Sequence, residues 1–343
     1  MFALCRTSHG SAVQQLLRAL CAVAAGADVC SGVGSAHLKT AAALCVSAVL
    51  GDACRRLSTM GGREGLPRSL GSVLGCWVVR FLGGFRGVER RVIPTRVSQS
   101  ISYGVAITRN GDTLLAVVSQ GFHVFSVRSG AHLRAVGTPG VGPLQFRSPM
   151  QICVASDDHV FVADCGNNRV QELTPEFDFH GFIGTGQLRD PVGVCADGGI
   201  VAVAEYFRCR ISVFRRGDGA LLRRFGSAGS GDGQLKWPQG ICFMNTSSRI
   251  AVADYSNKRI CVFHADGEFV RHVGAGQLHC PIGVACSVSG DELAVADIGG
   301  FCAPVLSSSD EMIRTVRGKF IGVAMHGDAI YAQTCHGGCV VFN

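Results

Sequence analysis

Residues 237–278 read WPQGICFMNTSSRIAVADYSNKRICVFHADGEFVRHVGAGQL, and this stretch decides the fold. After the anchor WPQGI and an apolar run come three short segments, RIAVAD, RICVF and EFVRHVG, made mostly of β-branched and apolar residues. Turn residues separate these segments, as at Ser256-Asn257 and Asp266-Gly267. The stretch therefore predicts four consecutive strands, which is the content of one blade of a β-propeller.

The same unit recurs along the chain. Aligned on the position of Pro149, the units start at residues 102, 149, 191, 238, 281 and 320, so they are 39 to 47 residues apart. A repeat of this length is typical of propellers and solenoids. The sequence predicts an all-β, six-bladed β-propeller over residues 86–343, with anchors ISYGV, SPMQI, DPVGV, WPQGI, CPIGV and KFIGV.

The order of these motifs resembles the NHL repeat. It combines a Pro-Xaa-Gly-Ile/Val anchor, a VAD strand end, an Asn-Xaa-Arg strand start and a GxGDGQL connector. Residues 235–278 match this pattern best, and 146–188 and 188–235 follow it closely. The last two units are weaker, and the first has Ser119 where the acid should be. The resemblance implies a propeller similar to those of NHL-containing ubiquitin-ligase proteins.

The two ends of the repeat region complement each other. The last unit ends at Asn343 after three strands, whereas the sequence ERRVIPTRV lies upstream of the first anchor. We expect Val88 to Ile93 to supply the missing outer strand, with Pro94 at its end, because this pairing leaves no open sheet edge. Residues 1–85 carry no repeat and are interpreted as a disordered extension rich in Ala, Gly, Arg and Cys.

Composition narrows the possible functions. Residues 1–95 hold eleven Lys and Arg against four Asp and Glu, whereas residues 96–343 hold 21 of each, so the propeller is close to neutral. This balance disfavours RNA binding without excluding it. No apolar run is long enough to span a membrane. Cytoplasmic localisation is expected, or mitochondrial if residues 1–30 act as a transit peptide.

The cysteines indicate a reducing environment. Their total of 17 is odd, and Cys153, Cys195 and Cys242 share one repeat position with Ala106 and Ala285. A position that accepts either residue type is small and buried, so these thiols are predicted to pack as small hydrophobic groups.

A recurring acid ends the second strand of four units, and in three of them an arginine follows five residues later. We expect each pair to fix the turn between the second and third strands as an ion pair, in preference to a ring of metal ligands. In the fifth unit Cys302 replaces the arginine after Asp297. The predicted pairs are Asp164 with Arg169, Glu205 with Arg210, and Asp254 with Arg259.

Catalytic motifs are absent from the sequence. It holds no nucleophile elbow, Walker loop or HExxH motif, and the paired CxxC ligands of a RING do not occur in residues 1–95. Some NHL-like propellers, such as the peptide-amidating lyases, use axial histidines, but here His123, His279 and His326 fall at unrelated repeat positions. We expect no cofactor and no metal, and enzymatic activity is less expected than binding.

The remaining candidate is a surface. Connectors before the anchors and turns after the second strands should emerge on one face of a monomeric propeller, where aromatic and basic side chains are typical binding residues. The alternative is that Trp237 packs beneath the next blade and the others are solvated turns. Three hypotheses follow: a protein-binding scaffold, with a substrate-adaptor role in ubiquitin transfer as its narrower form; an RNA-binding propeller; or a metal-dependent lyase-like enzyme using the central channel. The candidate residues are Arg189, Tyr206, Phe207, Arg208, Trp237, Tyr255, Lys258 and His279.

Overall fold

The computed structural model describes residues 90–95, 104–197, 199–244, 249–307, 309–335 and 338–342. The predicted extension over 1–85, the strand start at Val88 and the first three residues of the first anchor lie outside these ranges. The described part of the second compact unit, which spans Arg90–Asn343, is built almost entirely from strands. No described helix is long and apolar enough to cross a membrane.

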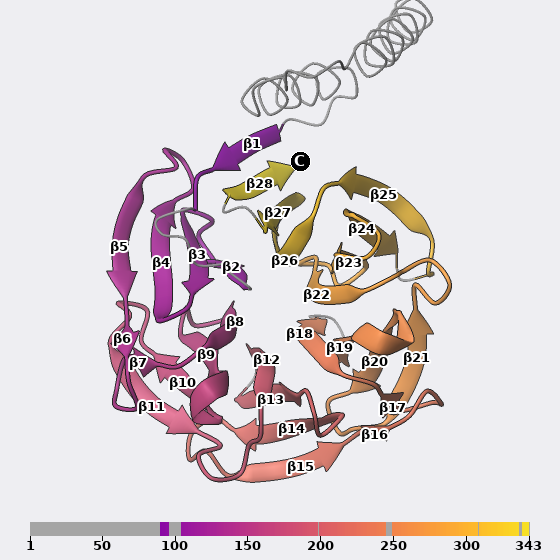
Figure 1. Cartoon of the computed structure of the whole chain (residues 1–343), viewed down its shortest axis with the longest axis horizontal. Coiled ribbons are helices and arrows are strands. Elements are labelled where there is room, and N and C mark those ends of the chain that lie inside the picture. Colours follow the sequence, from indigo (N-terminus) through magenta and orange to yellow (C-terminus); the bar gives the residue numbers. More distant parts are fainter. Residues whose placement is uncertain are drawn as a thin grey trace, which may run out of the picture. The chain divides into compact units, whose positions relative to one another are not determined.

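Six four-stranded antiparallel sheets are arranged as blades around a central axis (Figure 1). The prediction of a six-bladed propeller is confirmed. In the first five blades the strands run in sequence order from the axis outward.

Blade 1 consists of β2 (Val105–Ile107), β3 (Thr113–Val118), β4 (Gly121–Ser126) and β5 (His132–Val136), and blade 2 of β8 (Pro149–Val154), β9 (Val160–Asp164), β10 (Arg169–Leu173) and β11 (Phe179–Ile183). Blade 3 consists of β12 (Pro191–Asp197), β13 (Ile200–Glu205), β14 (Arg210–Arg215) and β15 (Leu221–Phe225), and blade 4 of β18 (Pro238–Met244), β19 (Arg249–Asp254), β20 (Arg259–His264) and β21 (Phe269–Val273). Blade 5 consists of β22 (Pro281–Cys286), β23 (Glu292–Asp297), β24 (Cys302–Ser307) and β25 (Met312–Arg317).

Blade 6 joins the two ends of the repeat region. Strands β26 (Phe320–His326), β27 (Ala329–Thr334) and β28 (Gly338–Phe342) are completed by β1 (Arg90–Ile93), which pairs antiparallel with β28. Figure 1 shows β1 beside β28, near the C-terminus. The predicted closing strand is therefore confirmed, and Pro94 follows its last residue. Side chains on both strands help to hold the closure, because Ile93 and Phe342 are almost fully buried.

The longest connectors between blades contain small parallel pairs. Strand β6 (Thr138–Pro139) pairs with β7 (Gln145–Phe146) before blade 2, and β16 (Ser227–Ala228) pairs with β17 (Gln234–Leu235) before blade 4. Two short 3-10 turns, η2 (Cys165–Asn167) and η3 (Tyr255–Asn257), join the second and third strands of the same two blades. The glycine-rich loop around Gly231 is thus part of a connector.

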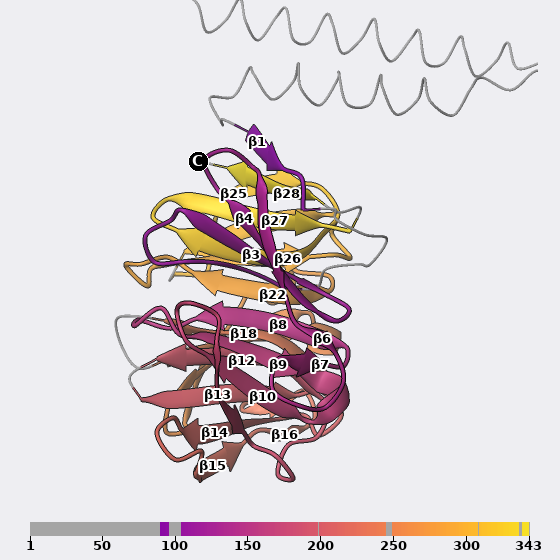
Figure 2. The same cartoon turned by 90° about the vertical axis from the view of Figure 1, so that its left-hand side faces the viewer.

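The core lies between neighbouring blades. Every residue of β9 is buried, and β13, β19 and β23 are buried after their first residue, because each second strand is covered by a blade on both faces. One cluster joins Ile211 of blade 3 to Ile250 of blade 4. Continuous apolar second strands such as VFVAD therefore follow from double burial, and the side view in Figure 2 shows the strands stacked in this way.

Candidate functional site

One face of the propeller collects the starts of the first strands. In blades 2 to 5 the anchor proline pairs in register with the acid that ends the second strand, as Pro149 does with Asp164. The connectors before the anchors and the turns between second and third strands therefore emerge together. We call this the anchor face, and the other end of the strands the opposite face.

The recurring acids tie the connectors to the blades. In each of blades 2 to 5 the acid accepts a hydrogen bond from the backbone N–H of the residue two positions before the anchor proline. The donors are Arg147, Arg189, Lys236 and His279, all with exposed side chains. These carboxylates therefore position basic side chains on the anchor face, a role that the sequence analysis missed because it considered only the pairing arginines.

The structure brings the members of each predicted ion pair into contact. Arg169 Nε lies 2.9 Å from Asp164 Oδ2, and Arg259 Nε lies 3.0 Å from Asp254 Oδ2, with both carboxylates fully buried. In blade 3 Arg210 donates from Nε and a terminal nitrogen to the two oxygens of Glu205, at 2.7 and 3.0 Å. The bidentate geometry is the arrangement that guanidinium and carboxylate groups favour.

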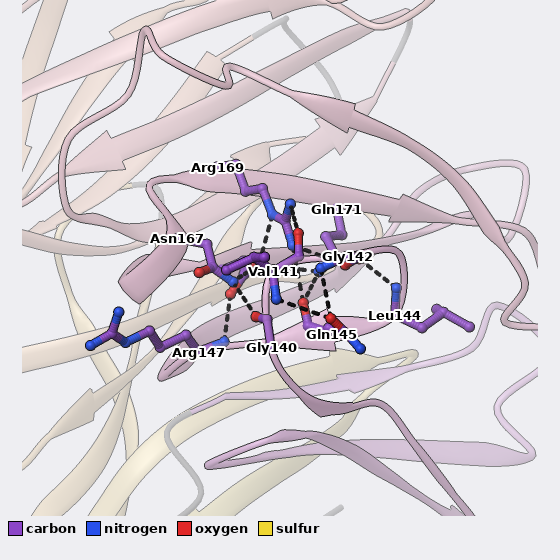
Figure 3. A network of polar contacts seen from close by, with 10 residues as sticks. Gly140, Val141, Gly142, Leu144, Gln145, Arg147, Asn167, Arg169 and Gln171 are labelled. Atoms are coloured by element: carbon purple, nitrogen blue, oxygen red, sulfur yellow. Dashed lines mark hydrogen bonds and ion pairs between the residues drawn. The ribbon is translucent and has the colours of Figure 1, made fainter.

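Arg169 also fixes the connector before its own blade (Figure 3). Its terminal nitrogens donate to the carbonyl oxygens of Val141, Gly142 and Gln145 at 2.6 to 3.1 Å, and Asn167 donates to that of Gly140. Arg259 repeats this pattern in blade 4 with the carbonyls of Gly231 and Gln234. The two long connectors are thus held by buried cations.

Blade 5 departs from the pattern. Asp297 is buried but has Cys302 in the register position of the arginine, as the sequence indicated. Its carboxylate accepts backbone N–H groups of His279, Cys280 and Gly300 instead. The His279 ring nitrogen Nδ1 lies 3.6 Å from the same carboxylate. Amide donors therefore replace the guanidinium here.

An aromatic cluster lies on the anchor face between blades 3 and 4. The Tyr206 and Trp237 rings stack with centroids 5.9 Å apart, and the Phe207 ring meets Tyr206 edge-on at 4.9 Å. Phe207 is 69% exposed and Trp237 is 42% exposed, so Trp237 is not buried beneath the next blade. Partial burial raises the pKa of both Tyr206 and Tyr255, with a contribution from Tyr206 at Tyr255.

Trp237 is held in a strained backbone conformation. Its φ of 58° lies in the left-handed region, which a bulky side chain rarely adopts. Ser148 and Asp190 have the same sign of φ at the equivalent position before the anchor, so the connector geometry imposes it. The left-handed conformation is therefore shared by these three connectors, and at position 237 it is occupied by a half-exposed tryptophan.

The predicted basic residues lie in loops of the same face. Arg208 and Lys258 are exposed in the turns of blades 3 and 4, and Arg189 and His279 are exposed in the connectors before blades 3 and 5. The structure adds Phe301, which is 60% exposed in the turn of blade 5. Phe301 occupies the repeat position that Lys258 occupies in blade 4, so an alignment of the repeats could have identified it as a surface residue.

Charge is divided between the two faces. In the described anchor-face loops the basic residues are Arg147, Arg189, Arg208, Lys236, Lys258 and Lys319, and the acids are Asp190 and Asp232. The described turns of the opposite face carry the reverse excess: the bases Arg109, Arg128 and Arg216 against Asp112, Asp157, Asp158, Glu176, Asp178, Asp218, Asp266, Glu268, Asp291, Asp310, Glu311 and Asp328. The net charge of the propeller is therefore close to zero because a basic face and an acidic face balance each other.

A glutamine crosses the central channel. Gln151 occupies the anchor position where the other five units have glycine. Its Oε1 accepts the backbone N–H groups of Val194 and Ile241, and its Nε2 donates to the Ile241 carbonyl at 2.9 Å. Glycine is required at three of the other units, because a Cβ at Gly104, Gly193 or Gly240 would lie 2.2 to 2.8 Å from a backbone atom of a neighbouring blade. Gln151 narrows the channel that the lyase-like hypothesis would use.

Metal-ligating groups are scattered. Within the described ranges no cluster of three or more His, Cys, Asp or Glu side chains could hold a metal ion. His123 pairs with His132 on the outer strands of blade 1 at 2.8 Å, far in sequence from His279 and His326. The cysteines of the described residues are free thiols, with Cys195 buried and Cys153 half-buried.

Comparisons with known proteins agree with the anchor motifs. Residues 146–173 match the NHL repeat. The chain is 47% identical over 68 residues to RING finger protein nhl-1 of Caenorhabditis elegans, covering 18% of this chain and 7% of that protein. It is 31% identical over 112 residues to protein brain tumor of Drosophila melanogaster, covering 32% of this chain and 11% of that protein. The chain thus spans about a tenth or less of the length of these relatives.

The fold is also that of distant propellers. The chain matches virginiamycin B lyase from Staphylococcus aureus with a TM-score of 0.54 at 14% identity, covering 73% of this chain and 83% of that one. At this identity the likeness concerns the fold alone. The resemblance to NHL-repeat propellers inferred from the anchors is confirmed by the repeat match and the six-bladed structure together.

Proposed function

We propose that this NHL-repeat propeller, over residues 86–343, is a non-catalytic scaffold that binds a protein partner on its anchor face. The observation that carries the proposal is the exposed, stacked cluster of Tyr206, Phe207 and Trp237. Aromatic side chains that are rigid and half-exposed contribute disproportionately to protein interfaces.

The buried carboxylates beneath the anchor face hold its loops in place, which favours a fixed binding surface over a mobile one. Glu205 and Asp254 each accept a connector N–H while pairing with an arginine, so the loops that bear Arg189 and Lys236 are anchored to buried carboxylates. Preorganised loops lose little conformational entropy on binding. Arg208 and Lys258, at the turns on either side, would form the polar rim of such an interface.

We further propose that the partner is a substrate presented to a separate ubiquitin ligase. The support is limited to the resemblance: the relative nhl-1 is a RING finger protein by its printed name. In this arrangement the chain supplies recognition while zinc-dependent chemistry belongs to another subunit. Partner ubiquitylation that rises when the chain is added to a ligase-containing extract, and does not rise with a binding-defective variant, would support this role.

RNA binding is the second candidate, and the charge distribution favours it. Six basic residues and an exposed aromatic cluster share the described loops of the anchor face, and basic and aromatic side chains together are the combination that binds single-stranded nucleic acid. Phosphate contacts release counterions, so such binding weakens steeply as salt is raised. A protein partner held by aromatic contacts is less sensitive to salt.

Affinity capture with the full chain distinguishes these candidates. Phe207→Ala removes an exposed ring without opening the core, and Leu133→Ala, at a 57% exposed position on β5, is the matched control. A protein recovered with the wild type and the control after nuclease treatment, but lost with Phe207→Ala, supports the scaffold. Loss on nuclease treatment assigns the face to RNA, and a partner retained by Phe207→Ala contradicts the proposed surface.

A further inference from the structure

The central channel opens widely on the opposite face. Here the ends of the six first strands surround a funnel of about 440 Å³. Its floor includes Gln151, whose side chain is fixed by three hydrogen bonds to blades 3 and 4. Most of the side chains that line it are apolar, among them Ile107, Val154, Phe243, Val284, Val288 and Met325, and the polar lining includes Arg109, Asp197 and His326. This volume is within the range of sites that receive a large side chain or a small ligand.

The rim of the funnel combines an exposed apolar residue with unpaired acids. Val288 is 67% exposed in the turn after β22. Four acids on this face have carboxylates that accept no hydrogen bond and form no ion pair within the described part of the chain. Asp197 lines the funnel, and Asp112, Asp291 and Asp328 lie in the turns that follow the first strands β2, β22 and β26. Two turn acids on this face are already paired, Asp157 with Arg216 and Asp218 with Arg215, each at 2.7 Å.

We propose that this funnel is a second docking site, which receives an apolar side chain from a lysine- or arginine-rich segment of a protein partner. The apolar walls favour burial of an uncharged side chain, whereas the unpaired carboxylates favour basic residues on either side of it. An acidic segment would meet the excess of carboxylates on this face and be repelled. The site does not depend on the anchor face, so a scaffold with both could hold two partners without competition.

The charge of the funnel also separates it from nucleic acid. Phosphate groups would approach a face whose described turns carry twelve acids against three arginines, so RNA is disfavoured there. A second copy of this chain is the other conceivable occupant, because its anchor face is basic. That arrangement would depend on protein concentration, which makes it measurable.

The test uses the full chain and a short fluorescent peptide in which lysines flank a single leucine. Fluorescence anisotropy should show saturable binding that weakens at least about tenfold in the double variant Asp112→Lys, Asp328→Lys, and also when the peptide leucine is replaced by serine. Val288→Ser should weaken binding as well, because it removes apolar surface at the rim without changing the charge. Asp232→Lys, an 80% exposed acid in an anchor-face connector, is the matched control and should leave the affinity unchanged.

Three results would overturn the proposal. If Asp232→Lys lowers the peptide affinity as much as the double variant does, the attraction between charges is unspecific. If the serine peptide binds as tightly as the leucine peptide, no apolar side chain enters the funnel. Absence of saturable binding would also contradict it. Sedimentation of the chain alone covers the remaining case: self-association that is abolished by the Asp112→Lys, Asp328→Lys variant would assign the funnel to a second copy. Because the Val288 variant and the Asp112→Lys, Asp328→Lys variant leave the anchor face unaltered, partner capture through Phe207 should be unaffected in them whichever result is obtained.

Discussion

The indole of Trp237 stacks on the ring of Tyr206, with centroids 5.9 Å apart and planes inclined by 20°. The two residues come from different blades, since Tyr206 follows β13 and Trp237 precedes β18. A single substitution there tests both packing and binding. Tyr206→Ala should weaken partner binding by about tenfold or more, as for an interface hot spot. Urea unfolding should show only a small loss of stability, and a collapse of the fold would make the contact structural instead.

Gln151 should contribute to stability through its bonds across the channel. Gln151→Ala leaves two N–H groups and one carbonyl without their partner, so unfolding should require about 1–3 kcal/mol less free energy. Gln239 is the control, because it lines the same channel and its side chain forms no hydrogen bond within the described residues. Equal effects of the two alanine variants in urea titrations would show that the crossing bonds add nothing.

Arg169 should be more costly to remove than Arg210. Arg169→Met strips a buried carboxylate of its cation and frees three connector carbonyls, which predicts a loss of about 3–5 kcal/mol. The Arg210 side chain is 26% exposed, so water can partly replace it at Glu205. Chemical denaturation of both methionine variants tests the order, and a larger loss for Arg210→Met would contradict it.

The closing strand should depend on one side chain. Ile93 is fully buried in β1, so Ile93→Ala should destabilise the propeller by about 2–5 kcal/mol. Its neighbour Val92 is 61% exposed, and Val92→Ala should change stability by less than about 0.5 kcal/mol. Thermal unfolding of the pair provides the comparison. Similar midpoints for both variants would mean that β1 does not hold the ring closed.

The channel thiols should make the propeller sensitive to alkali. Burial raises the pKa of the Cys153 thiol from its ordinary value of 9.0 to about 12, and raises the pKa of Cys195 and Cys242 well above 9.0. Between these values the unfolded chain holds fewer protons than the folded one, so stability is fully present below pH 9.0 and falls as pH rises toward 12.

Alanine at the same three positions removes that titration. Ala106 and Ala285 already occupy this repeat position, so the triple alanine variant should still fold. Its unfolding free energy should fall less steeply above pH 9.0 than that of the wild type. Parallel slopes in denaturation series across this pH range would contradict the role of the thiols.

The repeat was sufficient to predict the blades, their number and the closing strand, because anchors at regular spacing report on every blade at once. The spacing of the anchors could not predict the hydrogen bonds that side chains form between connectors and blades. The backbone N–H of Lys236 donates to the Asp254 carboxylate and so joins a connector to the end of a strand. The sequence pattern of acids paired with arginines does not predict this second hydrogen bond. The glutamine at position 151 was visible as a departure from glycine, but only the structure shows that it crosses the channel.

Charge was the least predictable feature. Its sum over the propeller is close to zero, yet the turns divide it because alternate turns emerge on opposite faces. The sequence held this information once the strands were placed. The near-neutral net charge of the propeller is therefore compatible with RNA binding on the basic anchor face.

Site-specific photo-cross-linking tests the central claim most directly. A photoreactive phenylalanine analogue is placed at Phe207 on the anchor face or at Leu133 on the outer strand β5, which are 69% and 57% exposed. We expect irradiation of cells to yield a discrete, nuclease-resistant protein adduct at position 207 and none at position 133. Nucleic-acid adducts at position 207, or protein adducts confined to position 133, would contradict a protein-binding anchor face.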